Sequence, residues 1–425
     1  MTLIKPLLNI VFNLVTPGSL KLLGSTLVVL QKNKWLKMKK KQIAVLFGGR
    51  SVEHEISIIT ALQLIEAMDT TRYDAIPVYV DQKGKWYCGE KLYDKDFYRT
   101  MPGSLKDVAQ VTLMPHPRSQ GLTVVDKKNK TIPVDVYLLA FHGQYGEDGC
   151  VQGLLELADA PYTGCDVMAS SLAMNKEHCK AVLKAHDIPV LPGIRIKRDD
   201  AQRSFNDVRT KIFATKGLET FPLFVKPCHL GSSVGIGKAS DMPSLNAALA
   251  NAFKYDTEII VEKCVEELLE VNISVIEGDT PKASAVEIPI SSGDALSYED
   301  KYLRGGKNKG KSNTQGMAGL TRDIDPQNLD VAIKEKIREY ALKAYDIIGC
   351  GGVVRFDFMV DTANDAIYFN ELNPIPGSMA YYLWEKTTPR ILYTEMIDII
   401  IQGAERRKTK KKGVQEDFGF KALKK

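Results

Sequence analysis

The chain has 425 residues, of which 44% are hydrophobic and 26% are charged, and its net charge of +5 comes mostly from the two ends. This composition is typical of about two to four domains with large buried cores, and the lack of arginine-rich or RNP-like aromatic patterns argues against nucleic acid as a partner. The seven cysteines are scattered without a C-x-x-C pair, which suits a reducing cytoplasm and argues against a disulfide scaffold or a zinc site.

Residues 1–37 differ from the rest because they contain no Asp or Glu, and the first acid in the chain is Glu53. Their longest charge-free run, Pro6 to Leu20, is too short to span a bilayer, so no stable membrane insertion is expected. Three interpretations stay open: a targeting or membrane-surface segment, a signal peptide, or translated upstream sequence. The last is favoured because Met38 and the KKKQIAVLFGG that follows it are typical of a start that leads directly into a first strand.

The first predicted strand, residues 43–47, ends in a glycine turn and leads into a helix that reaches about Met68. Strand, glycine turn and helix form the opening of a doubly wound α/β unit, in which the helix N-terminus can hold an anion. The turn lacks G-x-G-x-x-G and is therefore a weak candidate for a dinucleotide. Glu53 lies beside this turn and is a candidate for binding a substrate ammonium group; the alternative is a first-turn acid that complements the helix dipole.

Further strands are predicted over residues 75–80 and 134–141, with hairpins and loops over residues 81–130 between them. His142 follows the last of these strands and opens the glycine-spaced turn HGQYGEDG. Ligands of α/β sheets bind at this end of the strands, so His142 is a candidate substrate contact, with a structural role as the alternative.

A helix is predicted over residues 169–185, and a strand over residues 221–227 runs into the glycine-rich segment HLGSSVGIG. The backbone N–H groups and hydroxyls of such a loop can wrap phosphates. The lysine precedes the loop, and a strand follows it, so this is a nucleotide grip other than the P-loop; a plain hairpin turn is the alternative. The candidate phosphate contacts are Lys226, Ser232 and Ser233.

The predicted strand at residues 257–265 ends near Glu262 and Lys263, and its extended backbone can hydrogen-bond an adenine. Glu270, on the next strand, is a candidate for ribose hydroxyls. Residues 291–320 form a long loop with several cations, typical of a lid that closes over phosphates, although a mobile solvated loop is the alternative. A helix is predicted over residues 326–348, and the basic tail from residue 404 is expected to be disordered.

Two β-rich runs, VVRFDFMV and IYFNELNPIPG, flank a polar turn and are predicted to be neighbouring strands. A period of two places Arg355 and Asp357 on one face of the first strand, and Glu371 and Asn373 on one face of the second. Hard oxygen ligands that leave room for water and phosphate suit Mg²⁺, and an arginine beside them can stabilise a developing oxyanion. The alternative is a hairpin with a solvated polar face.

Eight motifs in order carry a family resemblance: LFGGRSVEHEIS, FHGQYGEDGCVQGLLEL, PYTGCDVMASSLAMNK, VKPCHLGSSVGIGK, VEKCV, YEDKY, VVRFDF and NELNPIPGSM. Together they resemble the ATP-grasp superfamily and, within it, the D-alanine–D-alanine ligases of bacterial cell-wall synthesis. The resemblance implies an α/β (α+β) protein with a three-domain ATP-grasp architecture and a Rossmann-like N-terminal domain. The implied segments are an extension (1–37), the substrate domain (38–165), the central lid domain (166–262), the catalytic domain (263–403) and a basic tail (404–425).

The resemblance also implies ATP-dependent ligation of two D-alanines through an acyl phosphate, in the cytoplasm, by a homodimer. The implied nucleotide contacts are Lys176, Lys226, Ser232, Ser233, Glu262, Lys263, Val265, Glu270 and Lys301. Two Mg²⁺ (or Mn²⁺) ions would be held by Asp357, Glu371 and Asn373. The implied catalytic residues are Glu53, Ser232, Arg355, Gly377 and Tyr302, and the implied substrate contacts are Glu53, His142, Arg355, Gly377 and Tyr382.

Two departures from the family pattern stand out. Asn175 stands where an Asp usually precedes the central lysine, and Tyr381-Tyr382-Leu383 replaces the usual His-Ser-Leu. Tyr302 resembles the dipeptide-forming members and favours an amine acceptor. The alternatives are a D-alanine–D-lactate ligase, another ATP-grasp carboxylate–amine ligase, a non-catalytic nucleotide-binding regulator, or a membrane-associated interaction protein.

Overall fold

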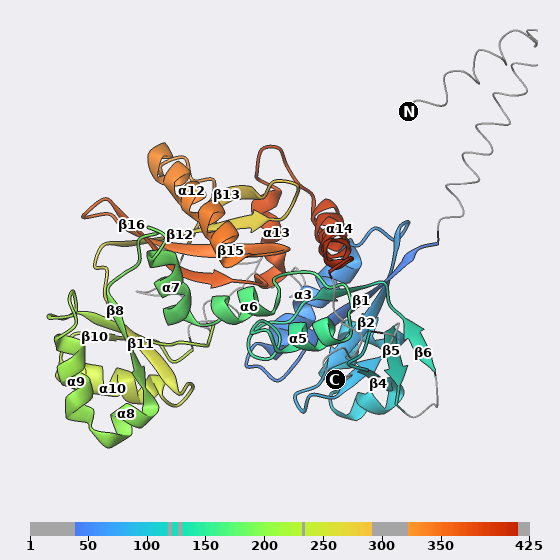
Figure 1. Ribbon diagram of the computed structural model, residues 1–425, viewed down its shortest axis with the longest axis horizontal. Helices are drawn as coiled ribbons and strands as arrows, with labels where there is room; N and C mark the ends of the chain where they lie inside the picture. The colour runs from blue at the N-terminus through green and yellow to red at the C-terminus, as the bar shows by residue number, and fades with distance from the viewer. Residues whose placement is uncertain (1–38, 118–120, 126–129, 232–233, 291–321, 415–425) are drawn as a thin grey trace, which may run out of the picture. The chain divides into compact units, whose positions relative to one another are not determined.

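The computed structural model describes residues 39–117, 121–125, 130–231, 234–290 and 322–414 (Figure 1). Their strands form three sheets of seven, four and five strands. Residues 42–69 and 75 onward belong to one compact unit. Residues 39–41 group instead with Thr70–Asp74, where the Lys41 N–H donates to the Arg72 carbonyl at 3.0 Å. No helix within the described ranges has the length and apolar content needed to cross a bilayer.

The first sheet has the order β6-β5-β4-β3-β2-β1-β7, with β1 and β7 parallel and the pairs from β2 to β6 antiparallel. Its strands are β1 (Lys41–Gly48), β2 (Tyr73–Val80), β3 (Trp86–Cys88), β4 (Ala109–Leu113), β5 (Gly121–Val124), β6 (Thr131–Pro133) and β7 (Val136–Leu139). Its helices are α3 (His54–Ala67), α4 (Lys95–Arg99) and α5 (Cys150–Leu157), with 3-10 turns at Glu90–Tyr93 and Gly103–Asp107. The predicted first strand, glycine turn and helix are confirmed. Gly48 is required in the turn, because its φ is +90° and a Cβ there would lie 2.3 Å from the Val80 carbonyl oxygen.

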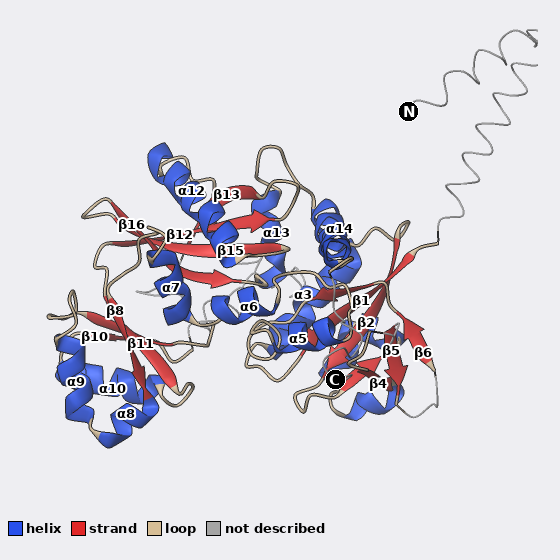
Figure 2. Ribbon diagram, viewed as in Figure 1, coloured by secondary structure: helices blue, strands red, loops and turns tan. Residues whose placement is uncertain are grey.

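The four-stranded sheet has the order β10-β9-β11-β8, and all of its pairs are antiparallel. Figure 2 shows its helices gathered on one face of the sheet, over a core of aliphatic side chains. The glycine-rich segment connects β9 to β10, as the sequence predicts. The elements are β8 (Gly193–Lys197), α8 (Arg198–Arg203), α9 (Phe205–Phe213), β9 (Leu223–Pro227), β10 (Gly237–Ala239), α10 (Met242–Ala252) and β11 (Glu258–Lys263).

The five-stranded sheet has the order β14-β13-β12-β15-β16 and is antiparallel throughout. Its core holds apolar residues of α6, α7 and α12 together with those of the strands. The elements are α6 (Val167–Ala173), α7 (Lys176–Lys184), β12 (Leu268–Ile276), β13 (Lys282–Pro289), β14 (Arg322–Ile324), α12 (Val331–Ile348), β15 (Val353–Asp361), β16 (Ala366–Asn373), α13 (Tyr381–Trp384) and α14 (Tyr393–Lys411), with a turn at Gly377–Ala380 before α13. The domain boundaries stay a prediction.

Three predictions about helices are corrected. The helix predicted over residues 169–185 is two helices, because Asn175 caps a new one by accepting from the His178 N–H at 3.0 Å. The helix predicted from residue 326 begins only at Val331, after Asp330 caps it. Residues 404–411, expected to be disordered, continue α14.

The basic residues of α14 are held by acids of the rest of the compact unit, which explains why this part of the tail is helical. Arg407 pairs with Glu277, and Lys411 reaches the Glu156 carboxylate at 2.6 Å. A run of cations that looks solvated in the sequence therefore contacts acids more than a hundred residues away.

Candidate active site

Strands β15 and β16 are neighbours, as predicted, with Asp357 opposite Glu371 and Arg355 opposite Asn373, and the register shifts between Asp357 and Phe358. Arg355 is buried and binds both oxygens of Asp357, through Nε and one terminal nitrogen at 2.7 Å each. Asn373 donates to Asp357 Oδ2 at 3.1 Å. Burial alone would lower the pKa of Arg355, but the Asp357 carboxylate outweighs it and raises that pKa well above its usual value, so the guanidinium stays charged.

Lys176 connects this hairpin to the glycine-rich segment. It is the first residue of α7, and its Nζ donates to the Leu230 carbonyl at 2.6 Å and lies 3.0 Å from Glu371 Oε2. Burial lowers the pKa of Lys176, but the nearby Glu371 carboxylate more than offsets this and the pKa is raised. The lysine is therefore positively charged at the point where the helix, loop and hairpin meet.

Asn175, the first departure from the family pattern, also contacts the glycine-rich segment. Its amide lies 2.9 Å from His229 Nε2, and the other ring nitrogen of His229 lies 3.0 Å from Asp256 Oδ2. The hydrogen bond with Asp256 raises the pKa of His229. The amide of Asn175 thus holds His229 at the start of the glycine-rich segment, and Asp256 is the acid that contacts this histidine.

The donor set at the hairpin fits a hard divalent cation. Two carboxylates and one amide provide oxygen ligands of the kind that Mg²⁺ prefers, and they leave room for phosphate and water oxygens. Within the described ranges no group of three His, Cys, Asp or Glu side chains is arranged to hold a metal ion. The carboxylates are at present balanced by Arg355 and Lys176.

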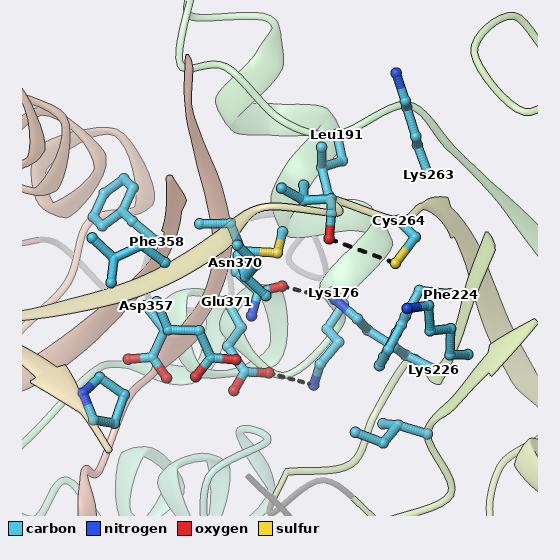
Figure 3. Close-up of a pocket in the computed structure, with 18 of the residues that line it drawn as sticks. Lys176, Leu191, Phe224, Lys226, Lys263, Cys264, Asp357, Phe358, Asn370 and Glu371 are labelled. Carbon is cyan, nitrogen blue, oxygen red and sulfur yellow. Dashed lines mark hydrogen bonds and ion pairs between the residues drawn. The ribbon is translucent and has the colours of Figure 1, made fainter. Parts of the chain in front are cut away.

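A large cavity of about 420 Å³ lies beside the hairpin, within the size range of ligand pockets. Predicted nucleotide contacts line it: Lys176, Lys226, Lys263, Val265 and Glu270, together with Asp357 and Glu371. Figure 3 shows lysine side chains reaching the β16 residues Glu371 and Asn370, the latter bonded to Lys226 Nζ at 2.9 Å. Strands of the four- and five-stranded sheets thus line one cleft with cations on one side and acids on the other.

Glu262 does not line this cavity. Its side chain is fully buried and pairs with Lys180 and with Lys226, whose Nζ lies 2.9 Å from Oε2. Burial raises the pKa of Glu262, but the two lysines outweigh it and lower the pKa to about 2. The carboxylate therefore stays ionised and holds Lys226 from behind.

A second, small cavity of about 40 Å³ contains the predicted amino-acid contacts Glu53, His142, Arg355 and Gly377, and it also borders on Lys176, Glu371 and Asn373. Glu53 stands at the N-cap position of α3, makes no side-chain capping hydrogen bond there, and is buried. Glycines make room for its carboxylate: a Cβ at Gly143 would lie 3.0 Å from Glu53 Oε2 and 2.2 Å from Ser51 Oγ, and one at Gly231 would lie 3.4 Å from Glu53 Oε2. Burial lowers the pKa of His142 to about 4, so its imidazole is neutral near pH 7.

Two buried residues of this region were missed from the sequence. Glu147 accepts from the Gly143 N–H at 2.6 Å and from the Ile375 N–H at 2.9 Å, and burial raises its pKa well above the usual value. Its position within the glycine-spaced turn was a usable signal. Thr60, on α3, bonds His142 Nε2 at 2.8 Å, and nothing in its sequence surroundings marks it.

The remaining predicted residues are placed as follows. Tyr382 is buried and is not among the residues that line either cavity; the guanidinium of Arg322 lies 3.8 Å from its ring centroid, and its hydroxyl donates to Glu287 Oε1 at 3.4 Å. Burial, and then the nearby Glu287 carboxylate, raise the pKa of Tyr382 to about 12. The predicted Ser232, Ser233, Lys301 and Tyr302 lie outside the described residues.

Comparison with known proteins identifies the family. Residues 42–165 match the family model "D-ala D-ala ligase N-terminus", and residues 182–402 match "D-ala D-ala ligase C-terminus". The D-alanine–D-alanine ligase of Thermosipho africanus is 33% identical over 370 residues, covering 87% of this chain and 95% of that protein. That of Ruminiclostridium cellulolyticum is 35% identical over 385 residues, covering 87% and 96%.

Two solved structures agree with this. The D-alanine–D-alanine ligase of Coxiella burnetii has a TM-score of 0.70 at 26% identity and covers 88% of this chain and 96% of that one. The VanG D-Ala:D-Ser ligase of Enterococcus faecalis has a TM-score of 0.70 at 29% identity and covers 86% and 100%. The chain therefore belongs to the D-alanine–D-alanine ligase family and has the ATP-grasp fold.

Proposed function

We propose that this protein joins two D-alanine molecules to D-alanyl-D-alanine at the expense of ATP, for peptidoglycan synthesis. Family membership supports the activity, and one observation in the structure supports its placement. Lys176 and Glu371 line both the large and the small cavity, so the two meet at this ion pair. A nucleotide in the first and an amino acid in the second would bring a phosphate and a carboxylate together there.

The nucleotide is assigned to the large cavity. Its adenine lies against the backbone near Lys263 and Val265, its ribose hydroxyls face Glu270, and its phosphates face Lys176 and Lys226. Glu262 acts from behind, because its ion pair holds the Lys226 ammonium at the cavity wall. The residues that would hold Mg²⁺ are Asp357, Glu371 and Asn373. When bound, Mg²⁺ would neutralise phosphate oxygens, so that an anionic nucleophile can approach.

The donor amino acid is assigned to the small cavity. Glu53 binds its ammonium group, and its carboxylate points toward the Lys176–Glu371 boundary. One carboxylate oxygen attacks the γ-phosphorus of ATP, and the bond from that phosphorus to the ADP oxygen breaks. The product is an acyl phosphate, whose carbonyl carbon is far more electrophilic than that of a carboxylate.

The amine of the second D-alanine then attacks the acyl carbon. The C–N bond forms, the bond to phosphate breaks, and the amine proton leaves with phosphate or water. Charge develops on the carbonyl oxygen in between, where Arg355 and the Gly377 N–H stabilise it. Oxyanion donors of this kind contribute about 3–4 kcal/mol each to lowering the barrier.

The acceptor is the least constrained part of the assignment. Tyr382 stands where many members have a serine that helps to hold the second carboxylate, and its hydroxyl is bonded to Glu287. A ligase that takes D-serine or D-lactate as acceptor is therefore a second candidate, and one of the similar structures is titled a D-Ala:D-Ser ligase. We favour D-alanine as the acceptor. We also propose that the protein is a cytoplasmic homodimer. Analytical sedimentation would measure the mass of the dimer.

The experiment is ADP release by the purified protein with Mg²⁺-ATP, measured without amino acid, with D-alanine alone, and with D-alanine plus D-serine or D-lactate. Mass spectrometry identifies each product. ADP release that depends on D-alanine, with the mass of the dipeptide, is the expected result. A mixed product formed in preference would move the assignment to that acceptor. ATP binding without D-alanine-dependent ADP release would contradict the proposed function and favour a non-catalytic regulator.

A further inference from the structure

The turn that carries Gly377 has an uncommon backbone. Ser378, Met379 and Ala380 have φ values of 52°, 53° and 50°, in the left-handed region that L-residues avoid, and all three are buried. Three such residues in succession persist only where surrounding contacts hold them. The contacts that hold this turn therefore also fix the position of the Gly377 N–H.

These contacts come from the segment that contains the first sheet. The Ile375 N–H donates to Glu147 Oε1 at 2.9 Å, and the Ser378 N–H donates to Thr60 Oγ1 at 3.2 Å. Thr60 Oγ1 also lies 2.8 Å from His142 Nε2. Hydrogen bonds on both sides of Gly377 thus tie the turn to α3 and to the loop after β7.

One hydroxyl joins the Gly377 turn to α3 and to His142. Thr60 Oγ1 accepts from the Ser378 N–H at 3.2 Å and lies 2.8 Å from His142 Nε2. A threonine hydroxyl has one O–H donor and two acceptor lone pairs, so it can accept from the Ser378 N–H and bond the imidazole at the same time. The hydrogen-bond chain runs from Ser378 through Thr60 to His142.

We propose that Thr60 is a positioning residue that holds the Gly377 turn in its left-handed conformation and thereby aims the Gly377 N–H at the reacting carbonyl. His142 belongs to the same hydrogen-bond chain, because its Nε2 is bonded to Thr60. That the Gly377 N–H acts on the reacting carbonyl rests on the proposed function. That Thr60 holds the turn does not.

The test compares Thr60→Val, which keeps the shape and removes the hydroxyl, with Thr60→Ser, which keeps the hydroxyl. The matched control is Thr163→Val. Thr163 is a buried threonine of the same segment whose Oγ1 accepts from a backbone N–H, that of Leu139 at 3.0 Å, without touching the turn. Each valine variant loses a hydrogen bond accepted from a backbone N–H, and Thr60→Val also loses the hydrogen bond with His142. Only Thr60→Val loosens the turn.

For Thr60→Val we expect kcat to fall about tenfold to a hundredfold, because small misplacements of catalytic groups have effects of this size. The KM for ATP should stay within about twofold, since Thr60 does not line the nucleotide cavity. Thr60→Ser should recover most of the wild-type kcat. If Thr60→Val has the same kcat as Thr163→Val, the positioning role is wrong.

Hydrogen–deuterium exchange without substrates provides a readout that does not depend on activity. Peptides that contain Ser378 should exchange faster in Thr60→Val than in wild type or Thr163→Val, and unchanged exchange would contradict the proposal. If wild type shows no D-alanine-dependent ADP release, the proposed function fails, and the exchange comparison alone decides whether Thr60 holds the turn. If Thr60→Val does not fold, Thr60→Cys replaces it, with a smaller effect expected in the same direction.

Discussion

The two cavities are built in different ways. The large one, of about 420 Å³, is lined by long lysine side chains and by acids on strands of two sheets. The small one, of about 40 Å³, is lined by Glu53, His142, Glu147 and Arg355, whose exposed fractions are all 8% or less. The first arrangement balances charge through ion pairs, with Lys176 held by Glu371 and Lys226 by Glu262. The second fixes the geometry of a small ligand through buried hydrogen bonds and backbone turns.

This difference indicates how binding and selectivity are divided. Phosphates are recognised mainly by charge, which ammonium groups provide. A small amino acid offers few atoms, so it must be recognised by groups whose positions are already set. Glu147, Thr60 and the left-handed turn fix the groups that recognise the amino acid. Glu262 and Lys180 support the charged groups that recognise the phosphates. Lys176 and Glu371 belong to both cavities, so changes there should have the largest effects.

Glu371→Gln is therefore the strongest test of where the cavities meet. The amide removes the charge that faces Lys176 and a carboxylate of the proposed metal site. We expect Mg²⁺-dependent ADP formation to fall by about a hundredfold to a thousandfold, the range seen when one group that stabilises transition-state charge is lost. Steady-state assays across a range of Mg²⁺ concentrations measure it.

The matched control is Glu339→Gln, which removes an exposed acid of α12 that pairs with Lys336 at 3.0 Å. It should leave activity unchanged, because exposed ion pairs contribute little. Near wild-type ADP formation by a folded Glu371→Gln protein would exclude Glu371 from the reaction. It would also contradict the proposal that the two substrates meet at the Lys176–Glu371 ion pair.

Glu262→Gln tests the buried support of the nucleotide cavity. It leaves Lys180 and Lys226 without their common counter-ion in a fully buried position. Removing one partner of a buried ion pair lowers the free energy of unfolding by about 3–5 kcal/mol. Urea titration measures this, and the KM for ATP should rise while the KM for D-alanine stays near its wild-type value.

Glu258→Gln, on the same strand but partly exposed beside Arg195, is the control and should change stability by less than about 1 kcal/mol. Equal destabilisation by the two substitutions would show that the buried pair has no special role.

The pH dependence of stability tests the buried histidine of the small cavity. Burial lowers the pKa of His142 to about 4, whereas an unfolded chain would protonate it near its usual value of 6.5. Between these values the unfolded state binds the extra proton, so the stability of the folded state falls as the pH falls from about 6.5 to 4. His142→Gln should reduce this slope by at most about 1.4 kcal/mol per pH unit. Identical slopes in urea titrations of the two proteins would contradict the lowered pKa.

The hairpin could be predicted from the sequence because its information is local. Alternation in two runs joined by a short turn fixes which residues share a face, and a one-residue slip would turn every side chain over. The prediction that pairing the two strands brings Asp357, Glu371 and Asn373 together is confirmed, whereas the register shift between Asp357 and Phe358 was not predicted. Lys226 was recognisable for a similar local reason, since a lysine beside so many small residues is hard to explain by packing.

Other features depend on contacts that no local pattern encodes. The Ile375–Glu147 and Ser378–Thr60 hydrogen bonds join residues 228 and 318 positions apart. A threonine on the buried face of a helix looks like any core residue until its partner is known. The basic end of α14 was misjudged because its acidic partners come from distant segments. The ion pair between the Glu262 side chain and Lys180 is likewise not visible in the chain order.

The central claim, that the two cavities bind different substrates, is tested most directly by one crossed measurement. The KM values for ATP and D-alanine are determined side by side in Glu53→Gln and Lys226→Met, with Glu55→Gln, an exposed acid of the same helix as Glu53, as control. We expect Glu53→Gln to raise the KM for D-alanine about tenfold or more and Lys226→Met to raise that for ATP, each leaving the other within about twofold. If both variants raise both values alike, the assignment of one substrate to each cavity is wrong.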